Sequence, residues 1–222
     1  MFGVDRPVVF LGPSCSVAHA KLKLDADFRP PATAGDIDTL VRTKITRVIV
    51  LIDGVLVDGY PPSPRELVRA LDAGCLVFGA ASIGALRAVE LWRQGMRGSG
   101  WIYRMYKAGR IDRDDELVSL MHPEHFFPLT VPLIRLRFAL RELRRDGRIE
   151  PRHARILFNR LKNVHYEERS AQRVRDQFSK LGLETRIANS ILTEERFDIK
   201  KLDCIGCLEQ VSALCEAQRG NL

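Results

Sequence analysis

The sequence predicts an α/β fold in which a small parallel sheet with flanking helices is followed by a mainly helical C-terminal half. Short apolar runs alternate with helix-compatible stretches in the first half of the 222 residues, and strand signals fade from about residue 130. Strands that alternate with helices indicate parallel pairing through right-handed crossovers, and continuously apolar strands suit a sheet covered on both faces. We therefore predict an α/β core at residues 1–129 and a helical region at residues 130–222 packed on it.

Three apolar runs predict strands of this sheet, at residues 8–11, 47–52 and 76–78. Helices are expected after each of them, at residues 16–24, from Pro64 onward and at residues 83–92. The second of these helices has a clear start signal, because Ser63 suits the N-cap, Pro64 the first helical position and Glu66 the third.

The second half predicts helices at residues 131–146, 151–163, 167–181 and 200–217. Residues 95–100 and 122–132 contain Gly or Pro and are expected to be loops. The acidic residues 112–116 are expected to begin a helix, since acidic side chains favour its first turn. Their alternative role would be to bind a divalent cation.

Composition excludes several classes of protein. No apolar run approaches the roughly 20 residues of a bilayer span, and Asp5 and Arg6 stand where a signal peptide would be apolar. An odd number of cysteines argues against a disulfide framework; they are Cys15, Cys75, Cys204, Cys207 and Cys215. We expect a soluble, cytoplasmic protein with reduced thiols and no membrane partner.

The net charge of +7 belongs to one segment of the chain. Residues 130–180 carry 14 basic and 6 acidic side chains, a balance of +8, whereas residues 1–129 carry 16 and 15. Such a segment meets an acidic partner, nucleic acid or only water. Nucleic acid is the less expected partner, because no binding motif or interleaved aromatic residue accompanies the basic side chains.

The turns that follow the three strands contain polar and small residues. Ligands of parallel α/β sheets bind outside the carboxyl ends of the strands, so Ser14, Asp53 and Ser82 are expected to converge there. The same residue types also serve as ordinary turn and cap residues. The loop at residues 12–14 has a further alternative as an anion or nucleotide site, although no glycine-rich phosphate motif supports it.

Ser82 is the most informative of these residues. It stands between an apolar strand and a helix and has only small residues around it, an arrangement similar to a nucleophile elbow. A serine nucleophile needs a base, and a lysine serves when burial favours its neutral form. Lys162 has the most apolar and aromatic surroundings, and Lys200 and Lys201 come next.

Cys204 and Cys207 form a single C-x-x-C pair in a predicted helix. One pair provides only two of the four ligands that a structural zinc site usually needs. A persulfide or redox role and a role as small core residues are the other interpretations, and the core role is favoured.

Several segments together resemble the signatures of the TfuA-like family. The resemblance is dense at residues 9–14, 50–55 and 79–91, and it continues through 95–100, 106–110 and 114–118. It is looser at residues 161–169 and 200–203. What it implies is a partner of YcaO, the ATP-using enzyme that replaces a peptide oxygen with sulfur.

The resemblance further implies a hydrolase that releases sulfide from a thiocarboxylated, ubiquitin-like sulfur-carrier protein, while YcaO holds the precursor peptide. A Ser–Lys pair is the machinery proposed for the family. Carried over, the nucleophile is Ser82, and the base is Lys162 or, as second choice, Lys201.

The chemistry of thiocarboxylate hydrolysis gives roles to the remaining residues. Ser82 attacks the carbonyl carbon, and backbone amides near Gly84 hold the oxyanion. Asp53 orients the lysine or Arg87, and Gly12 and Ser14 line the substrate site. Neither a cofactor nor a metal is expected. The rival prediction is a non-enzymatic adaptor that docks on YcaO and presents the peptide, with Ser82 as a turn residue only.

Overall fold

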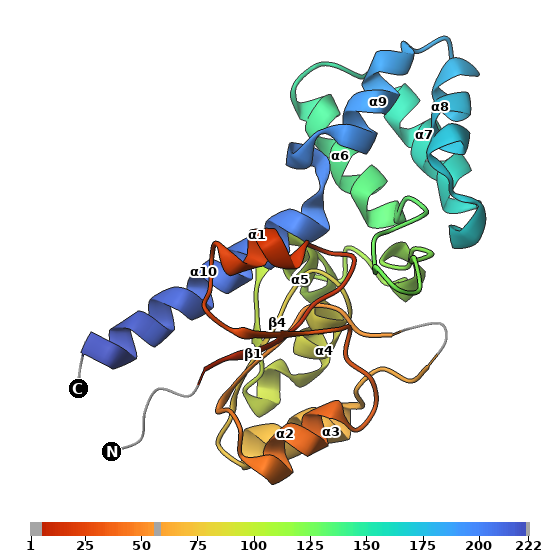
Figure 1. Ribbon diagram of the computed structural model, residues 1–222. Helices are drawn as coiled ribbons and strands as arrows, with labels where there is room; N and C mark the ends of the chain where they lie inside the picture. The colour runs from red at the N-terminus through yellow and green to blue at the C-terminus, as the bar shows by residue number, and fades with distance from the viewer. Residues whose placement is uncertain (1–5, 56–58, 221–222) are drawn as a thin grey trace. The chain divides into compact units, whose positions relative to one another are not determined.

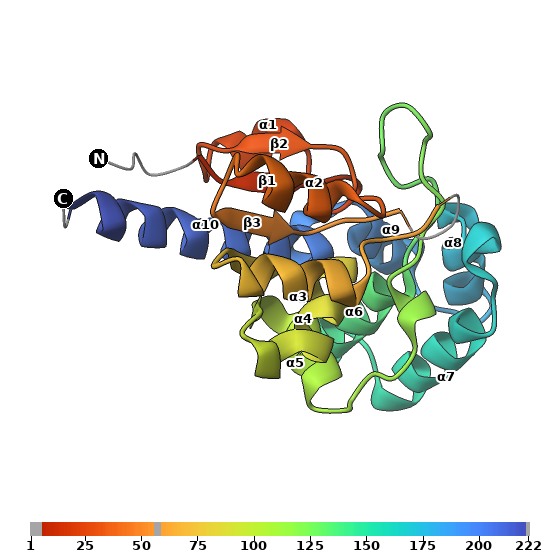
Figure 2. The same cartoon turned by 90° about the horizontal axis from the view of Figure 1, so that it is seen from below.

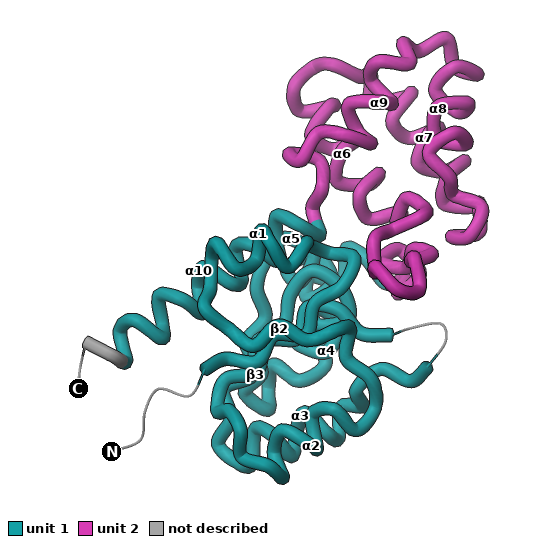
Figure 3. The backbone as a smooth tube through the Cα atoms, in the orientation of Figure 1, with its two compact units in different colours: residues 1–112, 200–222 teal, residues 113–199 magenta. Residues whose placement is uncertain are grey.

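The computed structural model describes residues 6–55 and 59–220. The chain forms two compact units, of which the first comprises residues 1–112 and 200–222 and the second residues 113–199 (Figure 3). The units divide the chain differently from the predicted halves, since the second begins at residue 113 and the last helix belongs with the sheet. Local contacts explain both differences, as described below.

The first unit is built on a five-stranded parallel sheet with the strand order β2-β1-β3-β4-β5. The strands are β1 (Val8–Phe10), β2 (Asp27–Arg29), β3 (Val48–Leu51), β4 (Leu76–Gly79) and β5 (Arg97–Gly98). The register pairs Phe10 with Leu51, and Leu51 with Gly79, so β1, β3 and β4 end side by side. This confirms the predicted parallel sheet.

Helices cover both faces of the sheet (Figure 1). One face lies against α1 (Val17–Lys21) and α10 (Ile199–Gly220), whose buried side chains share a core with alternate strand residues. The other face lies against α2 (Asp36–Thr43), α3 (Pro64–Asp72) and α4 (Ile83–Leu91), with α5 (Gly100–Lys107) beside α4 (Figure 2). This arrangement explains why the strands are apolar on both sides.

The start of α3 confirms its predicted signal. The Ser63 side chain accepts from the Glu66 amide, and the Glu66 carboxylate accepts from the Ser63 amide, which completes a capping box. Neither β2 nor β5 has an apolar run that would predict a strand, because β2 is a half-buried edge strand and β5 is only two residues long. Residues 95–100, predicted as a loop, therefore contain a strand.

The second unit is a helical bundle of α6 (Leu133–Arg145), α7 (Pro151–Lys162), α8 (Ala171–Ser179) and α9 (Thr185–Thr193). The first three helices were predicted and α9 was not. Residues 112–116 form a single 3-10 turn, at Asp114–Glu116, rather than the start of an α-helix. No helix in the described part of the chain combines the length and apolar character needed to span a membrane.

Buried charges link the segments of this second unit. The buried Glu116 carboxylate accepts two hydrogen bonds from Arg137 of α6, at 2.7 and 2.5 Å. This ion pair joins the segment after residue 112 to the helices and accounts for the unit boundary. Arg169 is 1% exposed and donates to the carbonyl oxygens of Val131 and Val164, at 3.4 and 2.9 Å.

In the first unit, Asp203 attaches α10 to the start of α5. Its carboxylate accepts hydrogen bonds from the backbone amides of Trp101 and Ile102, each at 2.7 Å. It thereby caps α5, which is distant from Asp203 in the sequence. A Cβ atom at Gly100, which has a φ of +92°, would lie 2.3 Å from Asp203 Cγ. Glycine is thus required where the carboxylate reaches the backbone.

Burial raises the pKa of Asp203 to about 6, against the opposing effects of the two amides and of Arg104. A folded pKa above the unfolded value of 3.8 means that the group stabilises the fold most fully below about pH 4. That stabilisation is lost as the pH rises through 6.

We predict that Asp203→Asn makes the stability of the first unit less dependent on pH. Between pH 5 and 7 the native unfolding free energy should fall by about 1 kcal/mol more than that of the variant, because only the native chain loses this proton. Urea unfolding at the two pH values measures the difference. Equal pH dependence in both proteins would contradict the assignment.

Candidate active site at the carboxyl edge of the sheet

The strand order reverses direction between β1 and β3, and this switch point is where ligands of open parallel sheets bind. Asp53, just beyond β3, is almost fully buried there. Its Oδ2 atom accepts the amides of Gly12 and Ser14, at 2.9 and 3.1 Å, and its Oδ1 atom accepts the Ser14 hydroxyl at 2.6 Å. One carboxylate therefore fixes the loop after β1 to the end of β3.

Close packing brings the neighbouring turns together. A Cβ atom at Gly54 would lie 2.9 Å from Cγ2 of Ile83, and a Cβ atom at Gly12 would lie 2.4 Å from Cγ of Pro31. The turn after β4 thus lies directly against the turn after β3. The predicted convergence of the three strand ends follows from these contacts, since β1, β3 and β4 are neighbours.

Ser82 occupies a strained turn between β4 and α4. The residue before it, Ala81, has a φ of +64°, and the Ser82 amide donates to the Ala80 carbonyl at 2.7 Å, which closes a three-residue turn. Such turns are rare for residues with a side chain and are found where the surrounding structure enforces them. The Ser82 hydroxyl makes no capping hydrogen bond to α4. It is therefore not needed to begin the helix.

The amides at the start of α4 have unequal roles. The sequence predicts that amides near Gly84 hold the oxyanion, and the amide of Gly84 itself already donates to the Ile52 carbonyl at 3.3 Å. The absence of a side chain at Gly84 has a packing reason instead, because a Cβ atom would lie 1.7 Å from the Leu51 oxygen. The first helical amide, that of Ile83, has no intrahelical acceptor and becomes the candidate oxyanion donor.

Arg87 holds a loop in place. Its Nε donates to the Pro62 carbonyl at 2.9 Å, and its guanidinium pairs with Glu90 at 2.8 Å. The contacts of Asp53 described above involve Gly12 and Ser14. The predicted role of Asp53 as a partner of Arg87 or of a lysine stays a prediction.

The candidate lysines lie in different units. Lys162 ends α7 in the second unit, whereas Lys200 and Lys201 begin α10 in the same unit as Ser82. Lys200 is buried and Lys201 is half-buried. The residues next to Lys200 in the sequence do not indicate its burial, which results from the packing of its helix.

Lys200 belongs to the buried stripe of α10. Cys204, Cys207, Leu208 and Val211 continue the stripe at helical spacing, and all are buried. The thiol of Cys204 forms a hydrogen bond with that of Cys15, and this contact and burial raise the pKa of Cys204. The charge of Asp53 adds to the shift, so the first turns of α10 lie near Asp53. The helical spacing of these residues is a signal that the sequence contains.

The C-x-x-C cysteines are core residues. Both pack in the cluster between α10 and the sheet, and burial raises the pKa of Cys207 to about 12. A thiol that stays protonated is a poor nucleophile and a poor metal ligand. Among the described residues, no group of three or more His, Cys, Asp or Glu side chains is arranged to hold a metal ion.

The fold and its carboxyl edge define a parallel α/β protein with a candidate site at the switch point of the sheet. A family model described as TfuA-like protein matches residues 53–170, more than half of the chain. The chain therefore belongs to the TfuA-like family. Asp53, Ser82 and Lys162 lie within the matched residues, whereas Ser14 and Lys200 lie outside them. No curated protein matches the chain.

We predict that Gly84→Ala destabilises the first unit by several kcal/mol, because the added methyl group would overlap the Leu51 carbonyl oxygen. Gly206→Ala is the matched control, since a Cβ atom there meets no atom within 4 Å and Gly206 lies inside α10. The control should gain up to about 1 kcal/mol from helix propensity. Thermal unfolding of the two variants measures both effects, and a stable Gly84→Ala protein would refute the packing at this turn.

Proposed function

We propose that this TfuA-like protein hydrolyses a thiocarboxylated, ubiquitin-like sulfur-carrier protein and supplies the sulfide for YcaO-dependent thioamidation of a peptide backbone. The observation that supports this most is the strained turn at Ala81, which presents Ser82 at the carboxyl edge without a capping bond. Strain of this kind is typical of functional turns. The precursor peptide is bound through YcaO, and the reaction takes place in the cytoplasm without a cofactor.

Lys200 is the base that the fold supports best. It is buried, it shares a unit with Ser82, and it lies one helical turn before Cys204, which approaches Asp53. A lysine that removes a proton must react in its neutral form. Lys201 is half-buried on the adjacent position, and Lys162 belongs to the other unit.

The reaction is an acyl transfer in two steps. Ser82 Oγ attacks the carbonyl carbon, Lys200 takes the hydroxyl proton, and the Ile83 amide stabilises the oxyanion. The carbon–sulfur bond then breaks, and the lysine returns the proton to the departing sulfur. Water attacks the resulting ester with the same base, so that thiocarboxylate and water give carboxylate and hydrogen sulfide.

The non-enzymatic adaptor is supported by a different observation. Ser82 is only 4% exposed, so a macromolecular substrate reaches its hydroxyl only if the surrounding turns move. In this second proposal the chain binds YcaO and helps it engage its peptide, and Ser82 serves the tight turn alone. Turnover, rather than binding, separates the two proposals.

We predict that Ser82→Ala and Lys200→Met each lower the rate of sulfide release from a thiocarboxylated carrier protein at least 100-fold, because each removes a group that acts in the transition state. Lys162→Met and Lys201→Met are matched controls that keep the volume of the side chain and should retain the native rate when the carrier protein is saturating. A sulfide-specific electrode follows the reaction, and calorimetry follows carrier binding.

The adaptor proposal makes the opposite prediction for the same proteins. If no protein releases sulfide, with or without YcaO, while native and Ser82→Ala proteins bind YcaO equally, the hydrolase proposal fails. If Lys162→Met or Lys201→Met alone abolishes release, the assignment of Lys200 fails and that of Ser82 stands.

A further inference from the structure

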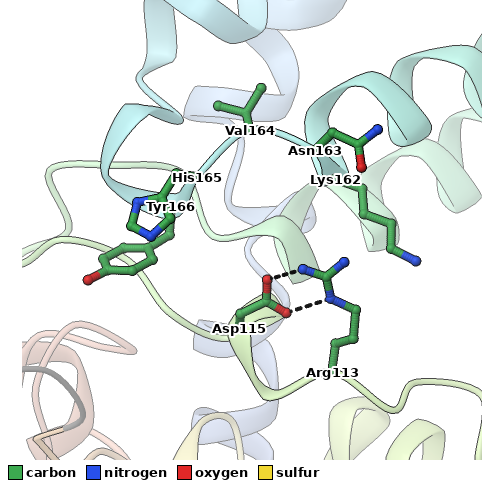
Figure 4. Close-up of a pocket in the computed structure, with 7 residues that line it drawn as sticks. All are labelled: Arg113, Asp115, Lys162, Asn163, Val164, His165 and Tyr166. Carbon is green, nitrogen blue, oxygen red and sulfur yellow. Dashed lines mark hydrogen bonds and ion pairs between the residues drawn. The ribbon is translucent and has the colours of Figure 1, made fainter.

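The second unit contains a pocket of ≈ 380 Å³ that plays no part in the proposed reaction. Figure 4 shows the side chains around it, which come from the segment after residue 112 and from the end of α7 with the turn that follows. They include Arg113, Asp115, Lys162, His165 and Tyr166. All of them belong to one compact unit, so the pocket is defined by that unit alone.

Positive charge predominates at this pocket. Arg113 pairs with Asp115, and this pair lowers the pKa of Asp115 and holds its carboxylate charged. Lys162 has no ion pair within the described part of the chain. The buried Arg169 donates to the carbonyl of Val164, a residue that lines the pocket. Its Nε atom has no hydrogen-bond partner among the described residues. The pocket is thus suited to an anionic group.

The exposed face of α7 extends the positive charge away from the pocket. Arg152, Arg155, Asn159 and Lys162 are spaced by three, four and three residues, so they lie on one face of the helix. Arg152 and Arg155 are exposed, and neither forms an ion pair with a described residue. We call these four residues the α7 stripe.

Elsewhere in this unit, arginines are commonly neutralised by nearby carboxylates. Arg135 pairs with Asp198 at 2.7 Å, Arg137 with Glu116 at 2.5 Å and Arg173 with Glu168 at 3.3 Å. Within the described chain, the α7 stripe lacks such partners although Glu and Asp are frequent nearby. A row of uncompensated cations that ends at a pocket is the pattern of a surface that receives negative charge from outside.

We propose that the pocket and the α7 stripe together bind an acidic, extended peptide segment of a partner protein. One carboxylate enters the pocket beside Lys162, and further carboxylates lie along the helix at Arg155 and Arg152. Ten residues of helix span about 15 Å, which an extended peptide covers in four to five residues. The bound segment therefore carries acidic residues at both ends of a stretch of that length.

A peptide fits this surface better than a nucleic acid does. The aromatic rings of the pocket, His165 and Tyr166, contact each other at a centroid distance of 4.4 Å. The α7 stripe itself has no aromatic residue on which bases would stack.

The test uses the full chain and two fluorescein-labelled peptides of ten residues. One alternates glutamate with glycine, and the other has glutamine in place of glutamate. Fluorescence anisotropy should show binding of the glutamate peptide that weakens as salt is added, and at least tenfold weaker binding of the glutamine peptide. Arg152→Glu/Arg155→Glu should weaken binding of the glutamate peptide at least tenfold, because two attractions become repulsions.

The matched control is Arg65→Glu/Lys180→Glu, which makes the same change in net charge at two exposed positions that form no ion pair with described residues. Its affinity for the glutamate peptide should stay within about threefold of the native value, as expected for a long-range effect screened by salt. Lys162→Gln should weaken binding without affecting the melting temperature.

Equal affinity for the two peptides, or equal losses in the double variant and its control, would overturn the proposal. Tighter binding of a ten-nucleotide poly(U) RNA than of the glutamate peptide, abolished by the same double variant, would assign the surface to nucleic acid instead. Neither assay involves Ser82 or sulfide, so this inference and the proposed hydrolase can fail separately.

Discussion

The candidate site depends on the hydrogen bonds that the buried Asp53 carboxylate accepts. This carboxylate is buried at the point where the sheet reverses its strand order, and it accepts two amides and one hydroxyl from the loop after β1. A buried carboxylate is stable only when such donors replace its water, and charge-assisted bonds of this kind contribute about 1.5–3 kcal/mol each. The loops after β1 and β3 are thereby fixed against each other, and the turn that carries Ser82 packs on them through Ile83 and Gly54.

The last helix completes this arrangement from the far end of the sequence. Asp203 caps α5, Cys204 contacts Cys15 beside the β1 loop, and Lys200 continues the same buried stripe. The first unit is thus built from both ends of the sequence, and the second unit is inserted between them. Our two proposals assign different roles to the units: the sheet unit carries the chemistry, and the α7 stripe of the helical unit binds an acidic partner.

Strong local signals made much of this fold predictable. The apolar runs at β1, β3 and β4 and the capping box at Ser63 are local features, and each was found. The sequence could not reveal β2 and β5, because edge strands of two or three residues need no apolar run. The Asp53–Ser14 bond and the burial of Lys200 were also beyond it, since both arise from contacts between distant segments. The small residues around Ser82 predicted a tight turn from strand to helix, but the positive φ of Ala81 became visible only in the structure. The structure also shows that the amide of Gly84 itself already donates to Ile52.

The most direct test of the central claim is to label the native chain with a fluorophosphonate, which reacts with serines activated by a base, and to locate the label by peptide mass spectrometry. The account predicts a single label on Ser82 that disappears in Lys200→Met and persists in Lys162→Met. A chain that stays unlabelled while folded, or a label on Ser82 that depends on Lys162 and not on Lys200, would contradict it.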